Sequence, residues 1–365
     1  MRIALVAPLY ESVPPRLYGG TERVVAQLAQ GLTAAGIETT VFASGDSQVS
    51  GRLVPVVPEA LRLCEDGIQD PAALHLALLA TVARQAREFD LIHNHHDYWM
   101  LPLTGLTDVP VVTTLHGKLG LMEPALAFRA WPKARYISIS HAQRQPMPDL
   151  PWVRTIHHGL DYTHLPFRGQ TGKYLAFLGR ITRDKGPAEA IRMAQLSGVP
   201  LKIAAKIEGP GTQEYFDAEV KPHIDGKNVE FIGEISDREK GEFLGDALAL
   251  AFPIDWPEPF GLVMIEAMAC GTPVLARPRG SVPEVVQDGV TGFIRESVDE
   301  LAQCVHRLPE ISRAACRTHV ERRFSLARMT EETIDVYQQL IGEAAGERSR
   351  SHRRNLLHSV ERSPF

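Results

Sequence analysis

The feature that most constrains the fold is an alternation of short apolar strands with amphipathic helices, which begins at the amino terminus. Residues 2–7 form a continuous apolar run, which is typical of a strand buried on both faces of a parallel sheet. A loop rich in proline and glycine follows, and residues 21–35 then carry apolar side chains at fourfold spacing from Val24 onward. This spacing predicts a helix with one apolar stripe. With a second strand expected at residues 39–43, the chain opens as a strand–helix–strand unit.

The alternation continues and then restarts. Further short strands are expected at residues 89–93, 109–114 and 135–140. A polar, turn-rich stretch at residues 161–172 interrupts the pattern, and a new series of strands and helices runs from residue 174 to residue 276. Two such series predict an α/β protein with two doubly wound, Rossmann-like domains, residues 1–166 and 167–325, that face a central cleft. Ligands of such sheets bind beyond the carboxyl ends of the strands.

Charge and cysteine content argue against several classes of protein. Lys and Arg together number 39 against 44 Asp and Glu, so the net charge is −5 and no nucleic-acid partner is expected. The four cysteines form no Cys-x-x-Cys pair, which argues against a zinc knuckle and a disulfide framework. No apolar run reaches the about 20 residues of a membrane-spanning helix, and no signal peptide is evident. A cytoplasmic protein without a transmembrane segment is expected.

The last twenty residues, 346–365, combine five arginines with two glutamates and show no sustained apolar period. Chain ends of this composition are commonly disordered, so we expect a mobile basic tail. Peripheral contact with an acidic membrane surface is the alternative.

A cationic turn follows the first expected strand of the second half. The strand ends in Leu178-Gly179-Arg180, and Lys185-Gly186 follows across a turn. Arginine offers a bidentate fork and lysine a point charge, which together suit a diphosphate. Two solvated cations at a strand–helix turn are the alternative, because charged side chains are mostly exposed.

A second candidate site surrounds the helix expected after residue 259. Pro259 suits the first turn of a helix and Gly271 suits its end. The amides of residues 260–262 then lie at a helix amino terminus, which is a ready anion site. Glu258 precedes this helix and Glu266 lies inside its apolar run, where a carboxylate is costly unless it is hydrogen-bonded. Ribose hydroxyls or a neighbouring backbone donor would satisfy it.

The two glutamates do not fit the catalytic pair of a glycosidase. Eight helical residues rise about 12 Å, whereas glycosidase carboxyl groups face each other at about 5–9.5 Å. Glu258 and Glu266 are therefore expected to contact different parts of one extended ligand.

Two glycine-associated positions stand out in the first half. Gly19-Gly20 precedes the first helix, so the amide of Gly20 could approach a phosphate, although the dinucleotide fingerprint G-x-G-x-x-G is absent. His116-Gly117 follows an expected strand and is placed at the cleft. A capping or packing role for this histidine is the alternative.

A separate candidate function is indicated by residues 93–97, with the sequence His93-Asn94-His95-His96-Asp97. Its H-x-H-x-D pattern follows a strand and begins the signature of a two-metal hydrolase, with His93, His95 and Asp97 as ligands. Tyr98 stands where that signature requires histidine.

Taken together, these motifs resemble those of the family-four glycosyltransferases, which are retaining enzymes of the GT-B fold. The resemblance runs from Met1 to about Leu340, and its most specific elements are Gly-Arg…Lys-Gly at 179–186 and the glutamates Glu258 and Glu266. Supporting elements are residues 19–22, 114–117, 158–161, 280–284 and 288–292. Residues 18–25 and 253–262 look most like the subgroup that includes the avilamycin-pathway glycosyltransferase.

The resemblance implies a sugar transfer from a nucleoside-diphosphate sugar, a UDP-sugar first and GDP-mannose next, to an acceptor hydroxyl. Arg180 and Lys185 would hold the diphosphate, Gly20 would approach it, and Glu266 would bind the ribose. The acceptor would be a saccharide, a lipid-linked saccharide or a small molecule. No cofactor or metal is implied, and a helix at about 326–345 would cross back to the first domain.

Further roles follow from the same resemblance. Glu258, with the amides of Phe260, Gly261 and Leu262, would bind the donor sugar and phosphate. His116 would lie beside the sugar, so the residues expected to act in catalysis are His116, Arg180, Lys185 and Glu258. His95 and Asp97, in the loop after an expected strand, are acceptor-side candidates. A sugar-nucleotide-binding protein without catalysis is a further alternative. One departure is His158, which replaces the asparagine usual before Gly-Leu-Asp, and another is Lys206, where many members have glycine.

Overall fold

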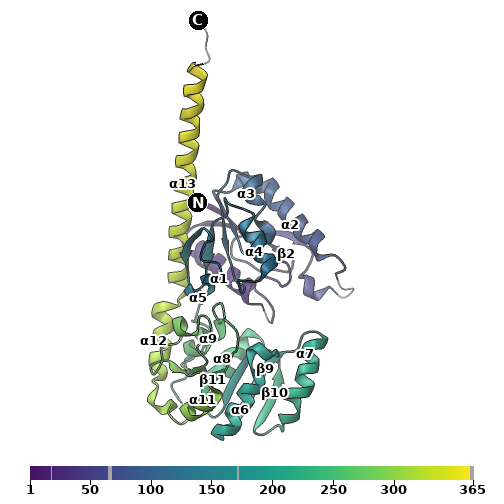
Figure 1. The fold of residues 1–365 in the computed structure, drawn as a ribbon, viewed down its shortest axis with the longest axis vertical. Coiled ribbons are helices and arrows are strands. Elements are labelled where there is room, and N and C mark those ends of the chain that lie inside the picture. The colour runs from purple at the N-terminus through teal and green to yellow at the C-terminus, as the bar shows by residue number, and fades with distance from the viewer. Residues whose placement is uncertain (18, 65–67, 171, 362–365) are drawn as a thin grey trace.

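The computed structural model describes residues 1–17, 19–64, 68–170 and 172–361, with only the backbone for residue 349 and residues 351–361. Within these ranges it contains two parallel sheets, one in each half of the chain (Figure 1). The α/β architecture expected from the strand–helix alternation is therefore confirmed. Tyr18, the first residue of one motif run, lies outside the described residues.

The first sheet has the strand order β3-β2-β1-β4-β5-β6-β7. Its strands are β1 (Arg2–Val6), β2 (Glu38–Ser44), β3 (Arg52–Val57), β4 (Leu91–Asn94), β5 (Val111–Thr114), β6 (Tyr136–Ser138) and β7 (Trp152–Thr155). The helices of this half are α1 (Gly20–Ala34), α2 (Pro71–Gln85), α3 (Leu103–Leu106), α4 (Met122–Arg129) and α5 (His141–Arg144).

The second sheet has the strand order β10-β9-β8-β11-β12-β13. Its strands are β8 (Leu175–Arg180), β9 (Leu201–Lys206), β10 (Val229–Gly233), β11 (Ala249–Phe252), β12 (Val274–Ala276) and β13 (Gly292–Ile294). The helices that follow β8 in the chain are α6 (Pro187–Ser197), α7 (Pro210–Tyr215), α8 (Asp237–Gly245), α9 (Leu262–Ala269), α10 (Val282–Val285), α11 (Val298–Val305), α12 (Arg313–Arg323) and α13 (Leu326–Glu361).

Strand β1 shows why the amino-terminal run is apolar without alternation. Ile3 and Leu5 pack on the side of α1 and α13, whereas Ala4 and Val6 pack with α2 on the other face. All four side chains have an exposed fraction of 0%. Helices therefore cover both faces of the sheet, and only the strand ends and the sheet edges remain for a ligand.

Both sheets contain a point where the chain reverses the direction in which it adds strands. In the first sheet β2 and β3 lie to one side of β1, and β4 lies to the other. In the second sheet β9 and β10 lie to one side of β8, and β11 lies to the other. Ligands of doubly wound sheets bind at such points, beyond the carboxyl ends of the strands. The loops after β1, β4, β8 and β11 are therefore the expected site.

The carboxy-terminal helix α13 returns to the amino-terminal half and packs against α1 (Figure 1). Its Tyr337 and Leu340 are buried in the same core as Leu28 of α1. The helix continues to Glu361, into the stretch where a mobile tail is expected, and the mobility of that stretch stays a prediction. Glutamate, alanine and arginine favour helix, and a packed helix extends readily. Residues 362–365 lie outside the described residues, and none of the described helices is both long and apolar enough to cross a bilayer.

Candidate active site

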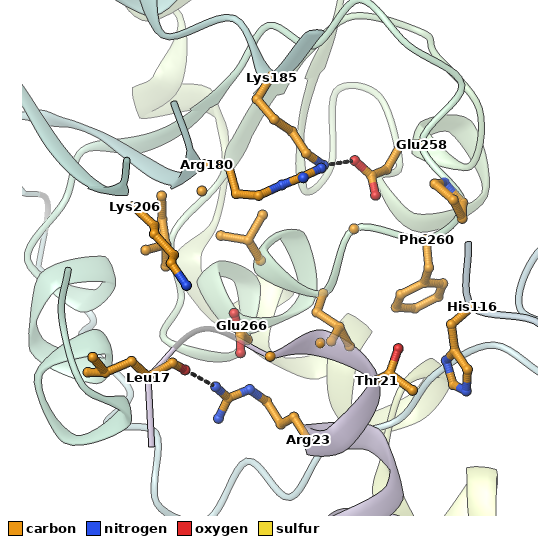
Figure 2. Close-up of a pocket in the computed structure, with 18 of the residues that line it drawn as sticks. Leu17, Thr21, Arg23, His116, Arg180, Lys185, Lys206, Glu258, Phe260 and Glu266 are labelled. Carbon is orange, nitrogen blue, oxygen red and sulfur yellow. Dashed lines mark hydrogen bonds and ion pairs between the residues drawn. The ribbon is translucent and has the colours of Figure 1, made fainter. Parts of the chain in front are cut away.

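A cavity of about 490 Å³ lies between the two halves, at the carboxyl ends of both sheets (Figure 2). Its wall comes from loops and helix starts that are far apart in the sequence. It contains the following residues that the sequence singles out: Gly20, His116, Arg180, Lys185, Glu258, Phe260, Gly261, Leu262 and Glu266. The structure thus gathers the two specific motifs and the two first-half positions around one space.

Two helices point their amino termini into this cavity. Helix α1 begins at Gly20 and α9 begins at Leu262, and both helices follow a glycine, so neither has a side chain that caps its first amides. A Cβ built on Gly20 would lie 3.9 Å from Cδ1 of Leu262, which shows how closely the two helix starts approach. Uncapped amides and the positive ends of two helix dipoles together favour an anion at this place.

Arg180 ends β8 and extends into the cavity (Figure 2). Its Nε is buried and has no hydrogen-bond partner among the described residues, and none of their carboxylates forms an ion pair with its guanidinium. The loop behind it is fixed by Gly186, whose φ is 75° and whose Cβ, if present, would lie 2.7 Å from the carbonyl oxygen of Pro253. A cationic group without a partner in a cavity is suited to bind an anionic ligand.

Lys185 contacts Glu258 across the cavity wall (Figure 2). Its Nζ lies 2.5 Å from Oε2 of Glu258 and 4.5 Å from the ring centre of Trp256. The indole Nε1 of Trp256 donates to the same carboxylate oxygen at 2.9 Å. In the free protein Lys185 is therefore balanced by Glu258, whereas Arg180 is not balanced by any described carboxylate.

Glu258 is held in place by the motif at residues 280–284. The amide of Ser281 donates to the carbonyl oxygen of Glu258 at 2.9 Å. A Cβ on Gly280 would lie 2.3 Å from that oxygen, so only glycine allows this approach. Glu284 of the same motif accepts hydrogen bonds from the amides of His141 and Ala142, at the start of α5 in the other half. The motif therefore links Glu258 to the amino-terminal half.

Glu266 is a buried carboxylate with a charged partner that the sequence did not indicate. Its Oε1 lies 2.8 Å from Nζ of Lys240, and Lys240 also pairs with Asp237, which in turn contacts Arg23 of α1. Burial alone would raise the pKa of Glu266, but Lys240 and Arg23 outweigh burial and hold it below its ordinary value. Burial lowers the pKa of Lys240. Glu266 is therefore a preorganised carboxylate at the boundary between the halves.

His116 lies at the cavity wall and belongs to a column of histidine rings. Its Nε2 is 2.9 Å from Nδ1 of His95, and its ring stacks on that of His158 with centroids 5.2 Å apart. The ring of His95 in turn lies 4.0 Å from that of His93. Burial lowers the pKa of His116 and of His93 to about 3, so these rings are neutral at physiological pH. His158 thus adds an aromatic ring to this column, which the asparagine usual at this position in the family would not do.

The acceptor-side candidates lie away from the cavity. His95 is 2% exposed and sits behind His116, so it is outside the cavity lining. Asp97 is also outside it; this residue has a φ of 43°, and burial raises its pKa to about 6. Neither side chain lines the cavity directly, although His95 contacts His116, which does.

The residues proposed as metal ligands have other partners. His93 makes hydrogen bonds of 2.7 Å with both Tyr337 and Thr114, which engages both of its ring nitrogens, while His95 pairs with His116. In the described part of the chain, no three His, Cys, Asp or Glu side chains are grouped in a way that could hold a metal ion. Nothing in this arrangement favours the metallohydrolase alternative.

Several cavity residues were missed by sequence reasoning. Arg23 and Lys206 line the cavity (Figure 2). Lys240 also lines it, as does Trp256, which lies in the run 253–262. The only sequence signal for Lys206 was its departure from a common glycine. Arg23 and Lys240 lie on helix faces whose partners come from other elements, so their spacing alone carries no signal.

Comparison with known proteins identifies the family. The glycosyltransferase family 4 sequences match residues 18–164, and the group 1 glycosyl transferases match residues 167–316, so the two matches together span both halves. The chain belongs to the family-four glycosyltransferases. Its fold is that of the GT-B members of this family. The family assignment made from the motifs is thereby confirmed.

Individual relatives of this glycosyltransferase are distant but full-length. The α-maltose-1-phosphate synthase of Mycobacterium tuberculosis is 27% identical, over 93% of this chain and 100% of that protein. The D-inositol 3-phosphate glycosyltransferase of Mycobacterium marinum is 27% identical, over 92% and 84%. Among solved structures, a glycosyltransferase involved in avilamycin A biosynthesis has a TM-score of 0.68 at 24% identity, over 94% and 98%. The sucrose-phosphate synthase of Thermosynechococcus elongatus has a TM-score of 0.76 at 18% identity, over 94% and 100%.

The buried carboxylate of this glycosyltransferase provides a first testable prediction. If Glu266 accepts hydrogen bonds from ribose, Glu266→Gln should raise the dissociation constant of a nucleoside diphosphate about tenfold, because hydrogen bonds to a charged group contribute about 1.5–3 kcal/mol. Isothermal titration with UDP measures this. Glu230→Gln, an exposed carboxylate of β10 that pairs with Lys202, is the control and should bind UDP unchanged. Equal affinity of wild type and Glu266→Gln would contradict the ribose role.

Proposed function

We propose that this glycosyltransferase moves a hexose from a nucleoside-diphosphate sugar, most specifically a UDP-sugar, to an acceptor hydroxyl with retention at the anomeric carbon. The observation that carries the proposal is the convergence of two uncapped helix starts, Arg180 and Lys185 on one cavity between the halves. This is a binding site for a diphosphate, reached from both domains.

The proposed chemistry follows from the charge that develops on the leaving group. When the bond between the anomeric carbon and the phosphate oxygen breaks, negative charge builds up on the diphosphate. Arg180 and the amides at the start of α9 are already in place, so they need little reorganisation as this charge develops. Preorganised donors of this kind are commonly the largest single contribution to catalysis. In this proposal Lys185 exchanges Glu258 for the diphosphate.

The other residues take roles along the extended donor. Glu266 accepts hydrogen bonds from the ribose. Glu258, freed from Lys185, and His116 contact the sugar, and Gly20 lets the start of α1 approach the diphosphate. His95 contacts His116 from outside the cavity lining, and His95 and Asp97 are kept as residues of the acceptor side.

Retention is proposed to occur by attack on the face from which the diphosphate leaves. The acceptor oxygen forms its bond to the anomeric carbon, the bond to the phosphate oxygen breaks, and the departing phosphate takes the proton of the acceptor hydroxyl. No enzymic nucleophile is needed. Glu258 is engaged by Lys185 and Trp256 in the free protein, which fits a binding role better than that of a nucleophile.

The choice of a UDP-sugar is supported by a structural neighbour. The Anabaena protein HepE, with a TM-score of 0.70 at 19% identity over 93% of this chain and 100% of that chain, was solved with UDP-glucose. We extend this to the present chain as a proposal and place the reaction in the cytosol, where nucleotide-sugars are supplied. The acceptor is a saccharide, a lipid-linked saccharide or a small molecule, and peripheral membrane contact is compatible with it.

A thermal-shift screen tests the donor. UDP, UDP-glucose, GDP and GDP-mannose are compared, because a ligand at 100 times its dissociation constant adds about 2.7 kcal/mol to the free energy of unfolding. We expect the uridine compounds to raise the melting temperature most. A rise with the guanosine compounds alone would indicate that the donor is GDP-mannose rather than a UDP-sugar. No rise in melting temperature with any of the four compounds would contradict the proposed function.

An assay of transfer separates an enzyme from a sugar-nucleotide-binding protein. With the donor that binds and a panel of saccharide acceptors, the product is isolated and its anomeric proton is examined by NMR. We expect the configuration of the donor to be kept. Inversion would contradict the proposed attack, and tight binding without turnover on any acceptor would favour the non-catalytic alternative.

A further inference from the structure

The hydrogen bond between His95 and His116 has a direction that the surroundings determine. It joins Nδ1 of His95 to Nε2 of His116 at 2.9 Å, so one of the two rings donates and the other accepts. Burial lowers the pKa of both rings, and each is therefore neutral with a single N–H. Two arrangements are open. Either His95 donates and the proton of His116 is on Nδ1, or His116 donates and its Nδ1 is bare.

The second nitrogen of His95 distinguishes these arrangements. Its Nε2 is buried and has no hydrogen-bond partner among the residues that the structure describes. If His116 donated, the single proton of His95 would have to sit on this nitrogen, as a buried donor without an acceptor. Such donors are rarer in proteins than unpaired acceptors. The arrangement in which His95 carries its proton on Nδ1 leaves only a lone pair without a partner.

We infer that His95 is a positioning residue, which donates its Nδ1 proton to His116 and thereby fixes His116 as a hydrogen-bond donor, through Nδ1, toward the donor sugar. Nδ1 of His116 is the ring nitrogen that no described residue engages, and His116 lines the cavity (Figure 2). The ring of His158 stacks on one side of His116, and together with the buried ring of His95 it holds the ring of His116 in this orientation.

This inference rests on the proposed function and adds the chemistry that the sugar must offer. A fixed N–H requires an acceptor, so the group of the sugar that faces His116 is an oxygen atom. A sugar that lacks this oxygen leaves the N–H unpaired in a desolvated wall. Discrimination against such a deoxy sugar follows, because an unpaired buried donor costs more than the hydrogen bond contributes.

The proton position is measured directly on the free protein. Long-range ¹H–¹⁵N correlation spectra of protein labelled with ¹⁵N at histidine report which ring nitrogen carries the proton, and the signals of His116 and His95 are assigned from their loss in His116→Gln and His95→Asn. We expect the proton of His116 on Nδ1 and its Nε2 bare. A proton on Nε2 of His116 overturns the inference. This readout does not depend on which donor is bound, so it stays valid if the proposed function fails.

Binding to His95 variants tests the consequence. In His95→Leu the donor to His116 is lost, and we expect the dissociation constant of UDP-glucose to rise about threefold to tenfold while that of UDP is unchanged. His95→Asn keeps an amide N–H near the position of Nδ1 and should restore the preference for UDP-glucose over UDP. Equal behaviour of the two variants overturns the inference, as does unchanged UDP-glucose binding in both.

The chain offers a matched control one residue away. His96 is buried at 5% exposure and makes the same kind of bond, from its Nε2 to Nδ1 of His75 at 2.9 Å, but neither ring lines the cavity. His96→Leu should therefore leave the ratio of the UDP-glucose and UDP dissociation constants unchanged. An equal change of this ratio in His96→Leu would show that the loss of any buried ring in this region disturbs the site. That result would overturn the positioning role of His95. If UDP does not bind to the wild type, the proposed function has failed, whereas the tautomer measurement still decides the position of the proton.

Discussion

Arg180→Ala should lower kcat about 100- to 1,000-fold. The guanidinium is the cation in the cavity that no described carboxylate balances, and its Nε is buried without a partner. A donor kept in this state is available for the charge that develops on the diphosphate, and removal of one such donor commonly costs about 10²–10³ in rate. Because that charge is larger in the transition state than in the bound donor, kcat should fall more than KM rises.

The measurement is initial-rate kinetics with the donor and acceptor that the thermal-shift screen and the transfer assay identify, and the control is Arg183→Ala. Arg183 lies in the same turn, but its side chain is 70% exposed, pairs with Glu219 and lies over the ring of Tyr215. It has the same charge and no place in the cavity, so its loss should change kcat by less than twofold. A similar fall in both variants would mean that general charge, rather than contact with the diphosphate, is responsible.

Lys185→Ala should also reduce kcat, but its effect has two origins. The lysine is expected to contact the diphosphate, and in the free protein it balances Glu258, which is 7% exposed. Its loss leaves a nearly buried carboxylate with Trp256 as its remaining partner. Full activity of both Arg180→Ala and Lys185→Ala would contradict the diphosphate site.

Much of the fold could be predicted because its central elements are the most regular. The strands next to the two reversal points, such as β1 and β8, are buried on both faces and give continuous apolar runs. Strand β3 was missed, because it lies at the edge of the first sheet, is only partly buried and contains Pro55. Edge strands tolerate proline and polar residues, which removes the apolar signal on which the prediction relies.

The site residues could be predicted where residues that act together are also close together in the sequence. Arg180 and Lys185 belong to one turn, and Glu258 and the start of α9 are neighbours in the sequence, so short motifs describe them. The pairing of Glu266 with Lys240 and the support of His116 by His95 join separate elements. No local pattern encodes these contacts, because each depends on how the elements pack together.

The same limit explains the placement of His95 and Asp97. Sequence order correctly puts both directly after a strand, at the carboxyl edge of the first sheet. It does not show that the loop after β5 brings His116 to the cavity, with His95 in contact with His116 outside the lining. Position at a strand end is thus not sufficient to make a residue part of the cavity wall.

Acidification should unfold this protein steeply below pH 6. Burial lowers the pKa of five histidines of the amino-terminal half strongly: His93, His95, His96, His116 and His158. In the unfolded chain they take up protons near the ordinary value of 6.5, whereas His93, His96 and His116 resist until about pH 3 when folded. Between these limits the unfolded state binds more protons, so stability falls as the pH falls, by about 1.4 kcal/mol per pH unit for each ring.

Two carboxyl groups with strongly raised pKa values act in the opposite direction. Burial raises the pKa of Glu22 to about 7 and that of Asp97 to about 6, so these groups hold protons in the folded state that the unfolded chain releases. They offset two of the five histidines between about pH 6 and pH 4.5. The net loss is then about 4 kcal/mol per pH unit, and a domain stability of about 5–15 kcal/mol is exhausted within a few units.

Urea denaturation at pH 7, 6 and 5 measures this dependence, and single variants assign it. His96→Gln keeps a polar atom for His75 but removes one titrating ring, so the loss of stability between pH 6 and pH 5 should become smaller by about 1.4 kcal/mol. This weaker dependence of the free energy of unfolding on pH is expected whatever the stability of the variant at pH 7. His223 is exposed in the folded protein, so His223→Gln should leave the slope as it is. If His96→Gln also leaves this pH dependence as it is, the buried histidines do not cause the acid sensitivity, because a ring that stays neutral only when folded must contribute to it.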